Sequence, residues 1–247
     1  MMTSKQRNYK LISLLFDTGS DYEKNLQTLL TLITQADEYT LIVAPEVCLT
    51  AYDYDNFDAL VAFGKRATQE IEKVSKNKII VLTIVEKKED GIFNFAKVFY
   101  NGEVVYQRAK ARLFRFGDEH KYMAEGSDED FKIVEVDGIK IAIFICFELR
   151  FKELWQKAEG ADVIAVPAWW GVSRTEHYRA LTQSLAIVNQ CYVVASDSLN
   201  KECTKMSGVI TPMGEEHRNG NKPCLELKYN KKDITLMRRY MDVGISG

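Results

Sequence analysis

Three residues have side chains suited to covalent catalysis and stand where buried strands are expected to end. Cys146 closes the apolar run IKIAIFI, Glu46 follows LIVA after one proline, and Lys110 comes shortly after VVYQ. In open α/β sheets, ligands gather beyond the carboxyl ends of the strands. A thiol, a carboxylate and an ammonium group in one pocket supply a nucleophile, a general base and a cation for a developing oxyanion.

Each of these residues also has a plainer interpretation. Free cysteine is among the most buried residue types, so Cys146 fits a structural thiol in the core. Glu46 fits a solvated turn residue, and Lys110 stands among three arginines and fits a basic surface. Taken one at a time, none of the three indicates a catalytic site.

The remaining cysteines and the histidines indicate no competing site. The five cysteines are an odd number without a CxxC pair, which favours neither a disulfide framework nor a zinc site. No histidine follows a buried strand as Cys146 does, so the base for a reactive thiol is expected to be another residue. We interpret four cysteines as inert and one histidine as structural: Cys48, Cys191, Cys203, Cys224 and His177.

The surroundings of all three candidates resemble the nitrilase superfamily of carbon–nitrogen hydrolases. The stretch APEVCLTAY at 44–52 is similar to the glutamate motif, KARLFRFGDE at 110–119 to the lysine motif, and ICFELRFKE at 145–153 to the cysteine motif. A fourth stretch, from GADVI to AIVNQ within 160–190, also resembles the family. Because four stretches occur in order and with plausible spacing, the resemblance is specific.

The resemblance implies a role for each matching residue. Cys146 would be the nucleophile, Glu46 the general base, and Lys110 the stabiliser of the tetrahedral intermediate. Glu119 matches a second glutamate that positions the substrate and the lysine, and the backbone N–H of Phe147 would donate into the oxyanion hole. The implied reaction passes through a thioester and requires neither a metal nor an organic cofactor.

The acid–base properties of this group can be anticipated. In water a glutamate with a pKa of ~4.3 is a poor base for a thiol with a pKa of ~8.5. We expect burial to raise the pKa of Glu46 and the charge of Lys110 to lower that of Cys146.

Further candidates would form the substrate pocket. Arg150 and Arg174 have the planar fork that binds a carboxylate, although structural pairing fits them equally well. Aromatic residues near the motifs are candidate pocket walls, with core packing as the alternative: Phe114, Phe116, Tyr122, Trp169 and Trp170.

The chain departs from the family pattern at five positions. Lys152 stands where proline is frequent, and Ala51 where glycine is frequent. Leu185 and Val188 replace a common arginine and glutamate, which we expect to exchange an ion pair for apolar packing. Trp169 replaces a smaller polar residue and puts the shape of the pocket in question.

The spacing of apolar residues predicts alternating strands and helices. Strands are predicted at 9–16, 41–44, 78–85, 93–100, 103–107, 131–136, 139–146, 162–167, 191–196, 206–212 and 224–229. Helices are predicted at about 21–36, 56–76, 150–159 and 174–189, the first with a capping box from Ser20 and Glu23. Two halves of similar order, together with the resemblance, imply an α/β fold: a four-layer αββα sandwich with two central mixed β-sheets, in a single domain over 1–247.

Composition limits the classes of partner. The chain has 247 residues, and its 33 basic and 35 acidic side chains leave a formal net charge of −2, so neither nucleic acid nor an anionic membrane is an expected partner. The apolar runs are too short to span a membrane and the first residues do not resemble a signal peptide, which predicts a cytoplasmic protein.

We therefore expect a cysteine-dependent amidohydrolase acting on a small linear amide. The run LFRFGDEH at 113–120 most resembles the ω-amidase-like branch, whose substrates are ω-amides of short dicarboxylic or oxo acids. The alternatives are an N-carbamoyl-amine hydrolase resembling N-carbamoylputrescine amidase, and a catalytically silent family member that serves as a binding protein. The resemblance also implies a homodimer or a higher homo-oligomer.

Overall fold

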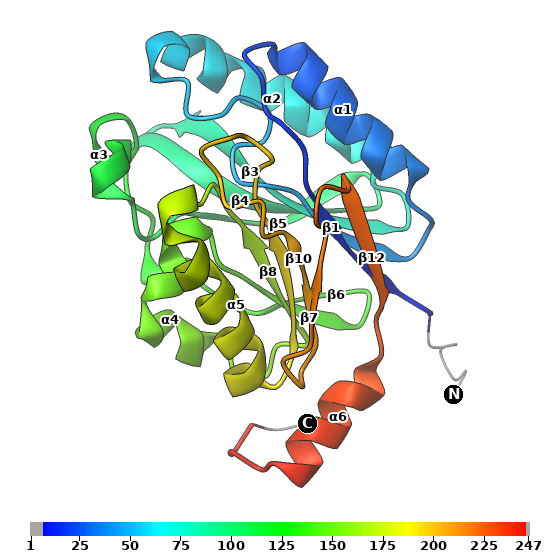
Figure 1. Cartoon of the computed structure of the whole chain (residues 1–247). Helices are drawn as coiled ribbons and strands as arrows, with labels where there is room; N and C mark the ends of the chain where they lie inside the picture. Colours follow the sequence, from blue (N-terminus) through cyan, green and yellow to red (C-terminus); the bar gives the residue numbers. More distant parts are fainter. Residues whose placement is uncertain (1–6, 246–247) are drawn as a thin grey trace.

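Strands that are apolar on both faces form the centre of the molecule. The computed structural model describes residues 7–245. Within this range, two six-stranded sheets lie face to face and helices cover their outer faces (Figure 1). The predicted four-layer αββα sandwich with two mixed β-sheets is confirmed.

The first sheet contains the strands from the first half of the chain and one late strand, in the order β12-β1-β2-β3-β4-β5. Its strands are β1 (Lys10–Leu14), β2 (Thr40–Val43), β3 (Lys78–Lys88), β4 (Gly91–Tyr100), β5 (Glu103–Ala109) and β12 (Cys224–Lys228). β1, β2 and β3 are parallel, whereas the other neighbours pair antiparallel. The predicted Asn101-Gly102 turn joins β4 to β5 with both residues at positive φ, as this type of turn requires.

The second sheet has the order β11-β10-β9-β8-β7-β6. Its strands are β6 (Val134–Val136), β7 (Ile139–Ile143), β8 (Val163–Pro167), β9 (Tyr192–Ser196), β10 (Gly208–Ile210) and β11 (Glu216–Arg218). β7, β8 and β9 are parallel, so each sheet has a parallel centre whose strands all end at one edge. This edge is where the candidate catalytic residues follow their strands.

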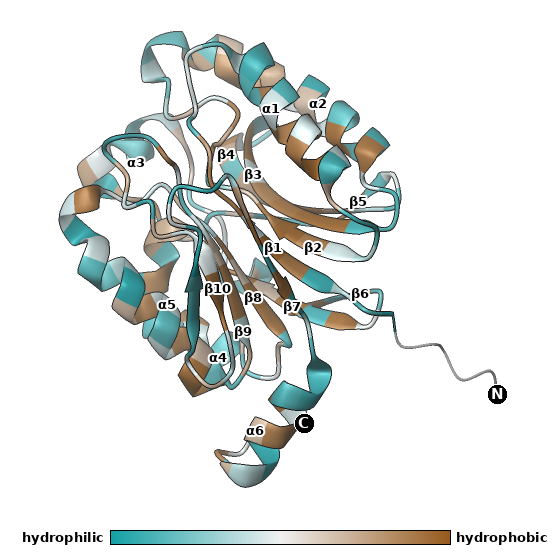
Figure 2. Cartoon of the chain, turned by 45° about the vertical axis from the view of Figure 1, so that its right-hand side comes forward, coloured by the Kyte–Doolittle hydropathy of each residue, from teal (hydrophilic) through white to brown (hydrophobic). Residues whose placement is uncertain are grey.

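Amphipathic helices cover the outer faces of the sheets. α1 (Tyr22–Gln35) and α2 (Phe57–Val74) pack on the first sheet, and α4 (Lys152–Lys157) and α5 (Thr175–Asn189) pack on the second. Two further helices are the short α3 (Glu119–Tyr122) and the C-terminal α6 (Lys231–Tyr240). Figure 2 shows hydrophobic residues concentrated on the strands and on the helix faces that turn toward them.

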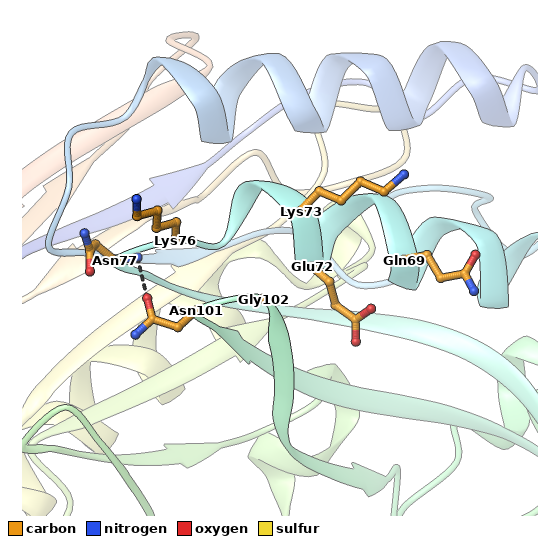
Figure 3. Close-up of a pocket in the computed structure, with 7 residues that line it drawn as sticks. All are labelled: Gln69, Glu72, Lys73, Lys76, Asn77, Asn101 and Gly102. Carbon is orange, nitrogen blue, oxygen red and sulfur yellow. Dashed lines mark hydrogen bonds between the residues drawn. The ribbon is translucent and has the colours of Figure 1, made fainter.

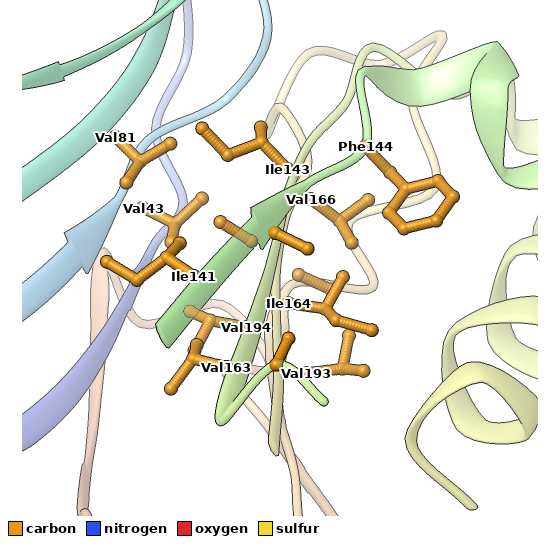
Figure 4. Close-up of a cluster of buried hydrophobic side chains, with 14 of the residues drawn as sticks. Val43, Val81, Ile141, Ile143, Phe144, Val163, Ile164, Val166, Val193 and Val194 are labelled. Carbon is orange, nitrogen blue, oxygen red and sulfur yellow. The ribbon is translucent and has the colours of Figure 1, made fainter. Parts of the chain in front are cut away.

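The layer between the sheets explains the uninterrupted apolar runs in the sequence. Val43 and Val81 of the first sheet face Ile141 and Ile143 of the second (Figure 4), and all four are almost completely buried. Their neighbours along the strands, such as Ile42, point the other way and pack in the cluster beneath α1 and α2. Strands that are covered on both faces have continuous apolar sequences instead of alternating apolar and polar residues.

The structure corrects several local predictions. The N-cap of α1 is Asp21, whose carboxylate accepts the backbone N–H of Lys24, so the capping box at Ser20 is wrong. The strand predicted at 131–136 begins only at Val134, and residues 131–133 connect it to a 3₁₀ turn at Asp128–Asp130. α6 and β11 were not predicted, since each offers few buried apolar residues.

The departures from the family pattern have distinct structural settings. Ala51 has φ +51°, a left-handed conformation in which glycine is less strained. Leu185 is buried in the core, but Val188 is 54% exposed, so the expected apolar packing of this pair is wrong for Val188. Lys152 is the first residue of α4, where proline is favoured.

Among residues 7–245, no helix is both long enough and apolar enough to cross a membrane.

The position of Lys152 gives a stability prediction. Phe151, the preceding residue, has φ −105° and ψ 101°, which is compatible with a following proline. Lys152→Pro is expected to stabilise the protein by about 0.4–1 kcal/mol through the unfolded chain, which corresponds to about 1–4 °C in melting temperature. The matched control, Gln156→Pro in the interior of the same helix, should lower the melting temperature. A lower melting temperature of Lys152→Pro in differential scanning calorimetry would contradict the assignment of Lys152 to the first position of α4.

Candidate active site

Four predicted residues converge at the carboxyl ends of the strands. Glu46 stands three residues after β2, Lys110 directly after β5, and Cys146 three residues after β7. Glu119 is the first residue of α3, in the connection between β5 and β6. The two sheets therefore share the site, because Glu46, Lys110 and Glu119 come from the first half of the chain and Cys146 from the second.

Lys110 lies at the centre of this group. Its Nζ donates to Glu46 Oε1 and to Glu119 Oε1, each at 2.8 Å, and all three side chains are buried. Burial opposes the charge of Lys110, but Glu119 and Glu46 together hold its pKa above the ordinary value. The lysine is therefore an ammonium group throughout the physiological pH range.

Glu46 has one oxygen fully engaged and one available. Oε1 accepts from Lys110 and from Asn94 Nδ2 at 2.9 Å. Oε2 is buried and accepts no hydrogen bond from any residue in the described range. Burial raises the pKa of Glu46, Lys110 opposes that increase and Glu119 adds to it, which confirms the expected direction. An unpaired carboxylate oxygen with a raised pKa is suited to accept a proton.

Cys146 begins a tight turn with a strained backbone. It has φ +45° and opens the 3₁₀ turn Cys146–Arg150. A left-handed conformation costs a residue with a side chain about 1–3 kcal/mol and occurs at functional sites. The thiol is 7% exposed and its Sγ lies 3.6 Å from the carbonyl oxygen of Trp169. Cys146 is therefore buried and belongs to the hydrophobic core cluster, and it also lines a pocket.

The pKa of Cys146 differs from the sequence-based expectation. Burial raises it well above its ordinary value, and the negative charge of Glu46 adds to this effect. Lys110 does lower it, as expected, but by less than burial and Glu46 together raise it. The prediction of a lowered pKa is wrong, and the resting side chain is a neutral thiol. Attack by sulfur consequently requires a base that removes the proton during the reaction.

The pocket at Cys146 is narrow, and four of its eight lining residues are aromatic. It contains about 240 Å³ of space, part of it open to solvent. Its lining residues are Phe114, Cys146, Phe147, Arg150, Trp169, Trp170, Gly171 and Arg174. Six predicted pocket residues therefore meet here with the nucleophile candidate. Phe147 directly follows Cys146 in the turn, while the proposed oxyanion role of its backbone N–H stays a prediction.

Two predicted aromatic residues lie outside this lining. Tyr122 stacks on Tyr54 with ring centroids 4.1 Å apart and is 38% exposed. Phe116 is 87% exposed, and its ring centroid lies 5.9 Å from that of Phe114, a lining residue. The structure therefore does not place either ring against Cys146.

Two arginines stand at the pocket without a carboxylate partner in the described part of the chain. Arg150 lies over the ring of Trp170 at 4.9 Å, and Arg174 over that of Phe114 at 5.4 Å. Burial and the nearby charge of Arg174 lower the pKa of Arg150. Gly171 makes room for this arrangement, since a Cβ there would lie 2.6 Å from Arg174 Nη2. The pocket consequently favours a negatively charged group.

Sequence reasoning did not assign two residues that complete the polar network. The Tyr52 hydroxyl donates to Glu119 Oε1 at 2.9 Å and lies 3.3 Å from Lys110 Nζ. Asn94 donates to Glu46 from the middle of β4. An asparagine within the apolar run FNFAKVF was an available signal, because a buried amide requires a partner.

A wider hollow elsewhere lacks these properties. It lies where α2 ends and the β4–β5 turn begins (Figure 3), and the backbone N–H of Asn77 donates to Asn101 Oδ1 beside it at 2.7 Å. Its lining residues are Gln69, Glu72, Lys73, Lys76, Asn77, Asn101 and Gly102, none of them a nucleophile beside a base. Residues 7–245 contain no group of three or more His, Cys, Asp or Glu arranged to hold a metal ion.

Comparison with known proteins identifies the family. The sequence model described as "Carbon-nitrogen hydrolase" matches residues 12–217, a range that includes Glu46, Lys110, Glu119 and Cys146. The chain belongs to the carbon–nitrogen hydrolase family. The expected membership of the nitrilase superfamily is confirmed, as is the prediction of a carbon–nitrogen hydrolase.

Individual carbon–nitrogen hydrolases support the same assignment. The chain is 30% identical to the 2-oxoglutaramate amidase of Bacillus subtilis (strain 168) over 193 residues, 74% of each protein. It is 29% identical to the deaminated glutathione amidase of Escherichia coli O157:H7 over 213 residues, 81% of each. Among solved structures, Nit3 of Saccharomyces cerevisiae superimposes with a TM-score of 0.82 at 22% identity, covering 96% of both chains, which shows a shared fold.

The electrostatics of this carbon–nitrogen hydrolase predict how Cys146 titrates. Because Glu46 raises the pKa of the thiol, Glu46→Gln is expected to lower it, whereas Glu72→Gln, in the hollow at the end of α2, should not. The measurement is the thiolate absorbance near 240 nm as a function of pH, taken as the difference between each protein and its Cys146→Ala counterpart. A thiolate already present at pH 7 in the unsubstituted protein would disprove the neutral resting thiol.

Proposed function

We propose that this carbon–nitrogen hydrolase cleaves the amide of a small ω-amide that carries a carboxylate at its other end. The observation that supports the proposal best is the position of Cys146. It lines a pocket together with two arginines, and it lies close enough to the Glu46–Lys110–Glu119 network for its charges to shift the pKa of the thiol. Relatives named as 2-oxoglutaramate amidase and ω-amidase are consistent with this substrate class.

The proposed acylation step uses the neutral thiol. Glu46 Oε2 takes the proton of Cys146 as Sγ attacks the amide carbon, and the carbonyl oxygen acquires a negative charge. The Lys110 ammonium and the Phe147 N–H would stabilise that charge. When the tetrahedral intermediate collapses, the C–N bond breaks, the nitrogen receives the proton from Glu46, and ammonia leaves a thioester on Cys146.

The proposed deacylation step repeats the same chemistry with water. Glu46 removes a proton from a water molecule while the water oxygen attacks the thioester carbon, and the C–S bond then breaks. The proton returns to sulfur, which restores the thiol and releases the carboxylic acid. Glu119 and Tyr52 would keep Lys110 in place through both steps, since both contact it directly.

The charges in the pocket distinguish the proposed substrate from the alternatives. Arg150 and Arg174 favour a carboxylate on the substrate through charge-assisted hydrogen bonds. No acidic residue belongs to the lining, which disfavours the cationic amine of an N-carbamoylputrescine-like substrate. A catalytically silent binding protein is disfavoured because nucleophile, base and ammonium group are all present. The homodimer or higher homo-oligomer and the cytoplasmic location stay predictions.

Trapping the acyl-enzyme tests the reaction. The protein is mixed with the monoamides of four- and five-carbon dicarboxylic acids and of their 2-oxo analogues. The reaction is quenched with acid during turnover, and the mass of the intact protein is measured by mass spectrometry. We expect ammonia release and a mass increase equal to the acyl group, both lost in Cys146→Ala and both kept in Cys224→Ala. Equal ammonia release by Cys146→Ala and the unsubstituted protein would eliminate the proposed mechanism.

Charge-neutral substitutions test the substrate class. Arg174→Gln and Arg150→Gln are each expected to reduce kcat/KM for a carboxylate-bearing amide by about 10–100-fold, since a hydrogen bond to a charged group contributes about 1.5–3 kcal/mol. Activity on an uncharged amide of equal length should change little. Arg179→Gln in α5 serves as the control, because Arg179 pairs with Glu216 and does not line the pocket. If the activity on both amides falls equally, the arginines do not bind the substrate carboxylate.

A further inference from the structure

A buried ion pair joins the strand that leads to Lys110 with the turn that carries Cys146. Arg108 lies two residues before Lys110 in β5, and Glu148 lies two residues after Cys146. Both side chains are almost completely buried and form a bidentate pair, with Arg108 Nη1 donating to Glu148 Oε1 at 2.9 Å and Nη2 to Oε2. The pair thus connects the two sheets directly beneath the active site.

The Glu148 carboxylate also holds the backbone on both sides of the site. Oε2 accepts the N–H of Ile145, the residue before Cys146, at 2.7 Å. Oε1 accepts the N–H of Ala111, the residue after Lys110, at 2.7 Å. A carboxylate has about four acceptor positions, and these two bonds with the two from Arg108 use all four.

Arg108 is similarly committed to the backbone. It donates to the carbonyl oxygens of Ile143, the last residue of β7, at 2.6 Å and of Ala109 at 3.1 Å. Its guanidinium lies over the ring of Phe131 at 4.8 Å. The ends of β5 and β7, which belong to different sheets, are therefore held by a single side chain.

We propose that Arg108 and Glu148 are positioning residues for the reaction described above. They fix the spacing between the Lys110 ammonium and the Cys146 thiol, and they hold the turn in which Cys146 adopts its left-handed conformation. Neither side chain lines the pocket, so the pair acts through the residues it fixes. A contribution to stability alone does not explain this arrangement, because buried ion pairs can be replaced by uncharged residues without loss of stability.

The consequence for turnover rests on the proposed function. A displacement of a reacting group by about 1 Å can reduce the rate about 100-fold. Substrate binding should be largely preserved, because Arg174, Trp169 and Trp170 line the pocket from outside the turn Cys146–Arg150. The positioning role therefore predicts a loss in kcat with little change in KM.

The test is the double variant Arg108→Met with Glu148→Gln, which leaves no unpaired charge buried. We expect a folded protein with kcat reduced about 100-fold and KM within about 3-fold. The matched control is Lys97→Met with Glu86→Gln, which removes a mostly buried ion pair between β3 and β4. The control should change the melting temperature but keep kcat within about 3-fold.

A second measurement does not depend on amide turnover. The pH profile of Cys146 alkylation by iodoacetamide should shift toward that of free cysteine in the double variant, because the thiol is no longer held beside Glu46, and should stay unchanged in the control. If the unsubstituted protein hydrolyses no amide, the proposed function fails and this profile still tests the pair. A folded double variant with unchanged kcat and an unchanged profile overturns the proposal.

A milder substitution covers the case in which the double variant does not fold. Arg108→Lys keeps the charge but loses the planar fork, so it cannot hold Glu148 and Ile143 together in the same geometry. We expect an intermediate loss of kcat, about 10-fold, at constant KM. Unchanged kcat in folded Arg108→Lys would also overturn the positioning role.

Discussion

One ammonium group buried between two carboxylates determines how this active site is built. Lys110 is in contact with Glu46 and Glu119, and the three charges together amount to −1 in the protein interior. Replacing Lys110 by an uncharged residue would leave two buried carboxylates uncompensated, and breaking a buried ion pair in this way costs about 3–5 kcal/mol. Asn94 and Tyr52 are needed for the same reason, since each supplies a hydrogen bond that the two carboxylates would otherwise lack.

Burial and the negative charge of this network together explain the state of the nucleophile. Burial raises the pKa of Cys146 most, and Glu46 adds to this increase because a thiolate would bring a further negative charge to the site, so the pKa is raised despite the nearby lysine. The site therefore does not store a reactive thiolate. Negative charge is proposed to develop only when the carbonyl oxygen of the substrate receives it, near Lys110 and the Phe147 N–H, so the stabilisation favours the transition state over the resting enzyme.

The sequence predicted those features that depend on local pattern or on the family motifs. Cys146, Glu46 and Lys110 follow buried strands, and parallel strand ends meet at one edge, so their convergence was predictable. Asn94 was not assigned, because its contact with Glu46 spans 48 positions and exists only once β2, β3 and β4 pair in register. The sign of the Cys146 pKa shift depended on the burial of the thiol and on its position relative to Glu46 and Lys110, which are properties of the packed structure. α6 was missed because only Ile234, Met237 and Arg238 of its ten residues are buried.

The apolar layer between the sheets ultimately sets the precision of the site. Lys110 depends on the first sheet and Cys146 on the second, so their separation is set wherever the sheets are held in register. Polar bonds reinforce this register at the strand ends, including Glu46 N–H to the Ala168 carbonyl at 3.2 Å and Ser13 Oγ to that of Ala195 at 2.7 Å. Because close-packed interiors yield little to small forces, a thiol and an ammonium group on opposite sheets can keep a fixed relation. A large core is thus the structural requirement for a site of only four ionisable side chains.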